Sequence, residues 1–305
     1  MFSTISNFFI RALLICSVLF AQDSMANQQS LSAYDLVVRM FDVSKQLDYK
    51  GVFTYEASTG DRRTVKVSHV VKEGVIYEQV TYMDGPQKEF VKVSAVNRCK
   101  REDFQRPEAR DHYRFDIIGE TRIAGRSAYK VRVWPKDDSR YGYLYAIDQQ
   151  TGLMLKSSLV DPAVGYLEHF KYVDINIDPQ IDMAMFKGVV PEDCAKSDLS
   201  AGYWSVGWVP EGFVPVSQAV SEQGRTSIVY TDGVTVFSVL IDPSEMPSEY
   251  PMISAHLGST QLIVVNQSVG QRHYKVTVSG QFPQGTATQI ARSISPLEAV
   301  QVNEE

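Results

Sequence analysis

The chain has 305 residues, carries a formal net charge of -6 at pH 7 and is 44% hydrophobic. The acidic balance argues against nucleic-acid binding, which rewards clustered positive charge. The hydrophobic content is ordinary for a chain that buries a core, and the length suits one large domain or two modest ones.

Residues 1–26 predict a secretory signal peptide. Arg11 precedes the apolar run ALLICSVLFA, and Ser24 and Ala26 place small residues at the two positions that a signal peptidase reads. The alternative is an N-terminal anchor that is never cut, but the run is shorter than the roughly 20 residues that a membrane-spanning helix needs. We therefore expect an exported protein.

A β-rich domain is predicted over residues 27–177. It begins with one helix, in which Ser32 and Asp35 resemble a capping box and apolar residues recur at helical spacing until Gly51. About nine short strands follow, rich in Val, Tyr and Phe and separated by Asp-Gly and similar turns. Such a set packs as one strongly curved antiparallel sheet or an unclosed barrel around the helix.

Periodicity fails over residues 178–202, which predicts a linker with one short helical turn. A smaller antiparallel sheet is predicted in residues 203–305, where two strands flank an Asp-Gly turn and the next two, TQLIVVNQS and HYKVTVSG, are expected to pair with each other. Thr286 and Gln289 resemble a capping box and predict a terminal helix. The expected fold class is therefore α+β.

Aromatic residues recur with period two along three of the predicted strands, so each group shares a face of its strand. The groups are Phe53 and Tyr55; Tyr141, Tyr143 and Tyr145; and Tyr166, Phe170 and Tyr172. One interpretation is a packed aromatic core. The other is that the curved sheet encloses an apolar cavity for a ligand. The candidate lining residues of that lipid cavity are Phe53, Tyr55, Tyr143, Tyr145, Phe170 and Tyr172.

The segment GYWSVGWVPEGF, residues 202–213, combines two tryptophans with glycines and a proline. These breakers predict that the segment forms no regular element. Trp204 and Trp208 are interpreted as large aromatic side chains that pin the start of the second domain. The alternative is that one of them faces a groove between the domains, where a partner peptide lies.

Sequence motifs for catalysis or metal binding are missing. The chain has no H-E-x-x-H, C-x-x-C, G-x-S-x-G, P-loop or dinucleotide pattern. We therefore expect no enzyme activity, no metal and no cofactor. Cys99 and Cys194 remain after removal of the signal peptide, and export favours a disulfide between them over two free thiols.

Five segments, by their order and spacing, resemble the RseB/MucB family of periplasmic regulators of the sigma-E envelope-stress response. They are GETRIAGRSAYKVRVWPKD, RYGYLYAIDQQTGLMLKSSLVD, WVPEGF, YTDGVTVFSVLID and VTVSGQFPQGTATQIARSI. The resemblance spans essentially the whole mature chain. It implies a large domain similar to the lipoprotein carriers LolA and LolB, with an apolar cavity, joined by a linker to a small C-terminal domain.

The resemblance also implies a function. Family members bind the periplasmic part of a single-pass membrane anti-sigma factor of RseA/MucA type and shield it from the site-1 protease. A lipid signal, such as displaced lipopolysaccharide, releases them, and proteolysis then frees the sigma factor. We therefore expect a periplasmic regulator of this kind. Whether it forms a homo-oligomer is left open by the sequence. The alternative is a lipid or lipoprotein carrier of LolA type, which the additional C-terminal domain disfavours.

Overall fold

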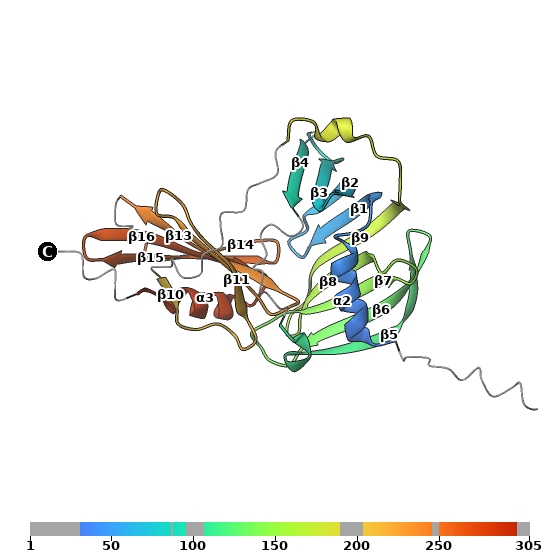
Figure 1. Ribbon diagram of the computed structural model, residues 1–305. Coiled ribbons are helices and arrows are strands. Elements are labelled where there is room, and N and C mark those ends of the chain that lie inside the picture. Colours follow the sequence, from blue (N-terminus) through green and yellow to red (C-terminus); the bar gives the residue numbers. More distant parts are fainter. Residues whose placement is uncertain (1–30, 87, 96–106, 190–203, 246–249, 298–305) are drawn as a thin grey trace, which may run out of the picture.

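The computed structural model shows a large β-rich domain next to a smaller one (Figure 1). The structure describes residues 31–86, 88–95, 107–189, 204–245 and 250–297. The predicted signal peptide and both cysteines of the predicted disulfide lie outside these residues. Within the described residues, no helix is long and apolar enough to cross a membrane.

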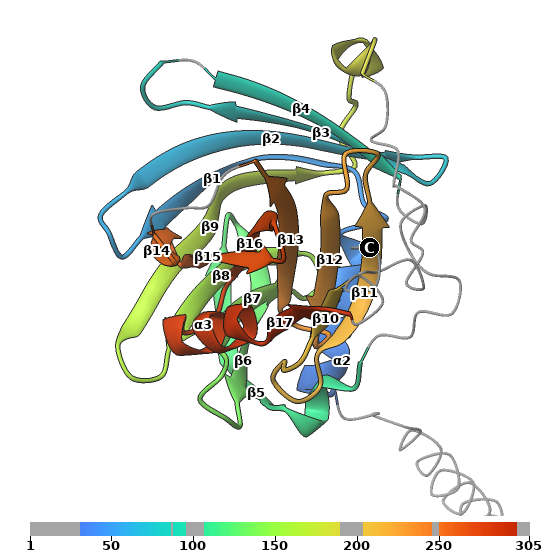
Figure 2. The ribbon, with the colours of Figure 1, turned by 90° about the vertical axis from the view of Figure 1, so that its left-hand side faces the viewer.

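The large domain consists of helix α2 (Ala33–Val43) and a nine-stranded antiparallel sheet, in agreement with the sequence-based prediction. Its strand order is β4-β3-β2-β1-β9-β8-β7-β6-β5, so β4 and β5 form two edges and the sheet is not closed. Figure 2 shows how strongly β1–β4 curve. The strands are β1 (Tyr49–Ala57), β2 (Arg62–Lys72), β3 (Val75–Tyr82), β4 (Lys88–Ala95), β5 (Tyr113–Ile123), β6 (Arg126–Pro135), β7 (Gly142–Asp148), β8 (Met154–Asp161) and β9 (Gly165–Ile177).

Helix α2 begins as predicted but ends earlier. Ser32 caps it, accepting a hydrogen bond from the backbone N–H of Asp35 at 3.5 Å. The helix stops at Val43, and Gly51 lies inside β1 instead of ending the helix. A Cβ at Gly51 would lie 2.7 Å from the ring of Tyr172, so this glycine is required by a close approach between neighbouring strands.

Strand β9 contains a bulge that changes which side chains share a face. Leu159 pairs with Glu168 and the next residue, Val160, pairs with Tyr166, so β9 has one extra residue at this point. Tyr166 therefore points away from the face that carries Phe170, and it is 55% exposed. The prediction that Tyr166 shares the face of Phe170 and Tyr172 is wrong because a bulge resets the alternation.

The small domain is a six-stranded antiparallel sheet with helix α3 (Gln284–Arg292) packed on β15 and β16. The predicted pairs across the Asp-Gly turn and between the two following strands are confirmed as β12–β13 and β15–β16. The strands are β11 (Val214–Val220), β12 (Thr226–Thr231), β13 (Val236–Ser244), β14 (Met252–Leu257), β15 (Thr260–Val269) and β16 (Arg272–Gly280).

Two details of the small domain differ from the prediction. Helix α3 begins after Pro283 with no side-chain cap, so Thr286 lies within the first turn and does not cap the helix. A short strand, β10 (Trp204–Val206), pairs with β17 (Ile294–Pro296) although the surrounding residues break regular structure. The partner strand comes from the far end of the domain, so no local pattern indicated it. The predicted linker contains one short helical turn, η2 (Met183–Phe186).

Candidate ligand-binding face and inter-domain contacts

The six predicted cavity residues lie on one face of the large sheet. Tyr145 pairs with Ser157, Ser157 pairs with Phe170, and Phe170 pairs with Tyr55. Directly paired residues of antiparallel strands point to the same side, so these aromatic side chains share a face. Tyr143 lies two positions before Tyr145 and so shares its face. Phe53 pairs with Tyr172, and this pair lies two positions along the strands from the pair of Tyr55 and Phe170, so it shares the face as well. We call this surface the aromatic face.

Tyr143 and Tyr145 occupy the part of the aromatic face beneath helix α2. Both side chains are buried, and their rings are stacked with centroids 5.5 Å apart and an interplanar angle of 9°. They pack in one core cluster with Leu36, Val37 and Met40 of the helix. Burial raises the pKa of both hydroxyls, which are therefore neutral at physiological pH.

Phe53, Phe170 and Tyr172 form a second aromatic group on the same face. The centroid separations are 4.6 Å between Phe53 and Phe170 and 5.0 Å between Phe170 and Tyr172. Tyr172 is buried, but Phe53 and Phe170 are only half-buried. These two phenylalanines are thus the more accessible apolar part of the aromatic face, which suits contact with an apolar ligand.

Tyr55 lies at a contact between the two domains. Its hydroxyl donates to Glu168 Oε1 at 2.7 Å, and the same oxygen accepts the backbone N–H of Ser259 at 2.7 Å. Gln281 donates its side-chain N–H to the other oxygen at 3.2 Å. Desolvation, followed by the bond to Glu168, raises the pKa of Tyr55. We call these four residues the turn contact, because Ser259 lies in the β14–β15 turn of the small domain.

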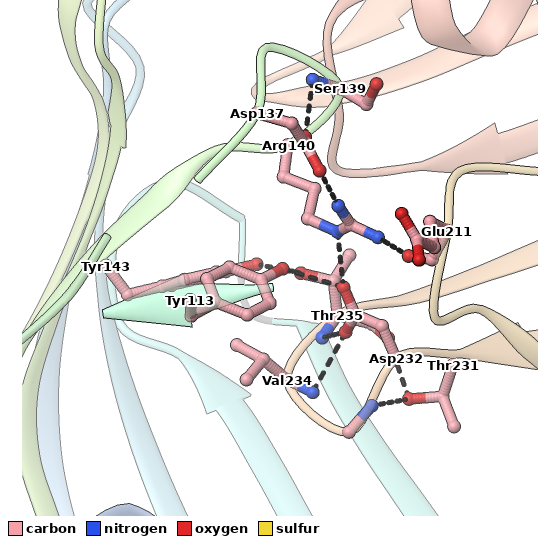
Figure 3. A network of polar contacts seen from close by, with 11 residues as sticks. Tyr113, Asp137, Ser139, Arg140, Tyr143, Glu211, Thr231, Asp232, Val234 and Thr235 are labelled. Carbon is pink, nitrogen blue, oxygen red and sulfur yellow. Dashed lines mark hydrogen bonds and ion pairs between the residues drawn. The ribbon is translucent and has the colours of Figure 1, made fainter. Parts of the chain in front are cut away.

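A second inter-domain contact is made by residues 231–235, which connect β12 to β13 and which we call the hairpin tip (Figure 3). Asp232 is 0% exposed and Arg140 of the large domain is 1% exposed. Arg140 Nε lies 2.9 Å from Asp232 Oδ2, and the hydroxyl of Tyr113 donates to the same oxygen at 2.8 Å. The hydroxyls of Thr235 and Tyr143 lie 3.0 Å apart.

The guanidinium of Arg140 bonds to both domains. Besides Asp232, it donates to the carboxylate of Asp137 in its own domain and to the backbone carbonyl of Glu211 in the small one. Its carbon also lies 5.2 Å from the ring centroid of Phe213, within range of a cation–π interaction. A buried charge is tolerated only when it is paired and hydrogen-bonded in this way.

The residues of these two contacts were not identified from the sequence. The Asp-Gly turn was predicted, but nothing local indicated that Asp232 pairs with a residue 92 positions away. An aspartate at the first position of a tight turn also has a local explanation, since its side chain bonds to the turn itself. Arg140 lies two residues before β7, yet a single arginine before a strand has no distinguishing pattern.

Both tryptophans of the 202–213 segment belong to the small domain. Trp204 is buried, and its ring meets Tyr274 edge-on with centroids 4.8 Å apart. Trp208 is half-buried, and its backbone N–H donates to Ser293 Oγ at 3.0 Å. Their packing against the core cluster of this domain favours a structural role. That one of them lines a partner groove stays a prediction.

Two surface hollows, of about 430 and 550 Å³, lie away from the aromatic face. The smaller hollow lies on the surface of α3, and the larger one lies between α2 and Thr151. None of the predicted cavity residues lines either of them. Across the part of the chain that the structure describes, no three His, Cys, Asp or Glu side chains are grouped to hold a metal ion.

Comparison with known proteins gives matches to both domains. Residues 32–106 and 101–190 match the model of the MucB/RseB N-terminal domain, and residues 198–295 match that of the MucB/RseB C-terminal domain. The chain is 28% identical over 301 residues to the sigma factor AlgU regulatory protein MucB of Pseudomonas aeruginosa, covering 90% of this chain and 94% of that protein. It is 25% identical over 307 residues to the sigma-E factor regulatory protein RseB of Haemophilus influenzae, covering 89% and 93%.

A solved structure resembles the whole two-domain arrangement. The crystal structure of MucB in complex with MucA(peri) matches with a TM-score of 0.66 and 27% identity. The match covers 87% of this chain and 98% of that one. The similarity therefore extends over both domains and is not limited to the β-rich fold of the larger one.

Proposed function

Because this chain belongs to the MucB/RseB family, we propose that it binds the periplasmic part of a membrane anti-sigma factor and thereby restrains a sigma-E-type stress response. The observation that carries the proposal is the match over both domains to MucB, a protein whose structure is solved in complex with MucA(peri). The predicted signal peptide supports a periplasmic location. The regulatory names of the relatives favour binding over catalysis.

Restraint of this kind requires only that the protein cover its partner. A segment that a protease can cut must be extended or disordered, and binding orders it at an entropic cost. The resulting affinity is modest and reversible, which suits a regulator that must later let go. Bound along the protein, the segment is no longer able to enter the site-1 protease.

Release is proposed to follow the binding of a lipid at the aromatic face. Six aromatic side chains share this face, and three of them, Phe53, Tyr55 and Phe170, are only half-buried. An apolar surface with a few polar groups at its rim is the usual composition of a ligand site. If lipid and anti-sigma factor exclude each other, each must lower the affinity of the other by the same factor.

The proposed function is tested by mixing the purified protein with the periplasmic segment of the anti-sigma factor from the same genome. We expect co-purification at low salt, and at saturating protein a roughly tenfold or greater slowing of site-1 cleavage of the segment, since cleavage then follows the small free fraction. Cleavage of an unrelated substrate of the protease serves as the control and should keep its rate. Failure of the segment to co-purify would contradict the proposal.

A carrier of LolA type is the second candidate. The aromatic face lies entirely in the large domain, which favours a lipid-handling role that does not need the small one. The test is transfer of a fluorescent phospholipid between donor and acceptor vesicles. Transfer that rises in proportion to protein concentration would favour the carrier, and an unchanged background rate would leave the regulator.

A further inference from the structure

The hairpin tip holds its own shape without help from the large domain. Asp232 Oδ1 accepts the backbone N–H groups of Val234 and Thr235 at 3.0 and 2.8 Å. The hydroxyl of Thr231 accepts the N–H of Gly233 at 3.1 Å and donates to the carbonyl of Thr235 at 2.8 Å. Gly233 has a φ of +91°, which glycine adopts without strain. The tip is therefore preformed.

Its remaining groups are directed into the large domain (Figure 3). The second carboxylate oxygen of Asp232 binds Tyr113 and Arg140. The hydroxyl of Thr235 lies 3.0 Å from that of Tyr143, and Val234 packs against the core cluster that contains Tyr143. One oxygen of the aspartate thus shapes the turn, while the other attaches it to the partner domain.

The position that the tip occupies belongs to the aromatic face. Tyr113 and Tyr143 share this face, because Tyr143 pairs with Val133, Val133 pairs with Phe115, and Phe115 lies two positions from Tyr113. Tyr143 stacks directly on Tyr145, so the row of rings continues from the tip towards Phe170. Helix α2 and the tip both cover Tyr143, so a long apolar chain that lies along the row reaches this ring only if the tip moves aside and the side chains of α2 make room.

We propose that the hairpin tip is an intramolecular plug that competes with a long-chain lipid for the Tyr143 end of the aromatic face. The inference rests on the lipid-release step of the proposed function. Lipid entry displaces the tip, breaks the Arg140–Asp232 pair and separates the small domain from the large one. Conversely, a seated tip lowers the affinity for the lipid, because only the fraction of molecules with the tip displaced is competent to bind.

The test compares four proteins for the binding of parinaric acid, a long-chain fatty acid whose own fluorescence rises in apolar surroundings. They are the wild type, Asp232→Asn, Thr235→Val and Asp116→Asn. The first two substitutions keep the size of the tip and weaken its attachment. Asp116→Asn is the matched control, since it neutralises an exposed carboxylate that pairs with Arg132 at 2.8 Å on the face of the sheet opposite to Tyr113 and Tyr143.

We expect Asp232→Asn and Thr235→Val to lower the Kd for parinaric acid, the former by about tenfold, because each raises the competent fraction. The control should bind like the wild type. In the reciprocal arm, saturating parinaric acid should raise the radius of gyration of the wild type in small-angle scattering. Thr235→Val removes one hydroxyl only and keeps the test decisive if Asp232→Asn does not fold.

If the folded tip variants bind parinaric acid with the Kd of the wild type, the plug is wrong. Lipid release would still be supported in that case, because the wild type binds the fatty acid. If neither the wild type nor the variants bind parinaric acid, both the plug and the lipid-release step are wrong. Co-purification of the anti-sigma segment, measured on the same samples, would still support the regulatory function in either case.

Discussion

The two contacts between the domains differ in how they use charge. In the hairpin-tip contact, Arg140 and Asp232 form an ion pair that is almost fully removed from water. In the turn contact, the charge of Glu168 is shared among neutral donors from Tyr55, Ser259 and Gln281, in half-buried surroundings. Removing one partner of a buried ion pair is costly, because the other charge is left without compensation. Hydrogen bonds from neutral donors are weaker, because water readily replaces those donors. In the absence of lipid, the tip is therefore expected to hold the two domains together more strongly than the turn contact does.

Substitution of Asp232→Ala should have the largest effect. It removes the fully buried one of the two carboxylates that pair with Arg140, together with the acceptor of the Tyr113 hydroxyl, at a cost of about 3–5 kcal/mol in the free energy of unfolding. Denaturant unfolding followed by tryptophan fluorescence measures the loss. Asp116→Ala, which breaks an exposed pair with Arg132, should cost under about 1 kcal/mol. Equal losses in the two variants would show that the tip does not hold the domains together.

Substitution of Gly258→Ala tests the geometry of the turn contact. The residue has a φ of +59°, and a Cβ there would lie 2.5 Å from Glu168 Oε1 and 2.7 Å from the Tyr55 hydroxyl. Backbone strain alone costs about 1–2 kcal/mol, and the clash adds to it. Gly74→Ala is the control, because its φ is +73° and nothing lies within 4 Å of its Cβ. A loss no greater than that of the control would contradict close docking of the turn.

Substitution of Glu168→Gln should have a smaller effect, about 1 kcal/mol. The amide keeps an acceptor for Tyr55 and Ser259 but loses the charge that strengthens those bonds. Limited proteolysis between the domains should accelerate slightly in this variant and strongly in Asp232→Ala. Faster proteolysis of Glu168→Gln than of Asp232→Ala would show that the turn contact, and not the tip, is the stronger of the two contacts.

A buried carboxylate inside the large domain, Asp148, stabilises the fold at neutral pH and loses this contribution in acid. Burial alone would raise the pKa of Asp148, but hydrogen bonds from Arg126 and Thr151 bring it below its usual range. The folded pKa is thus lower than the unfolded one, so this stabilisation is complete above about pH 4 and disappears as the pH falls through the folded value. Unfolding measured over an acid pH series should show a slope that Asp148→Asn removes.

Much of the fold was predictable because its signals are local. The cap at Ser32, the number of strands in the large domain and the hairpin at the Asp-Gly turn follow from residues a few positions apart. Two of the errors share one cause, which is that partners distant in sequence overrode the local pattern. Gly51 makes room for Tyr172, and the bulge in β9 turned Tyr166 to the opposite face.

The sequence by itself determined most of the elements, the shared face of Tyr143 and Tyr145, and the family to which the chain belongs. Only the tertiary structure decided which face of the sheet the small domain covers and which charges join the two domains. The physical reason is that alternation and turn propensity act over a few residues, whereas the pairing of Arg140 with Asp232 depends on the exclusion of water by both domains together. No short segment of the sequence shows that both domains will exclude water around this pair.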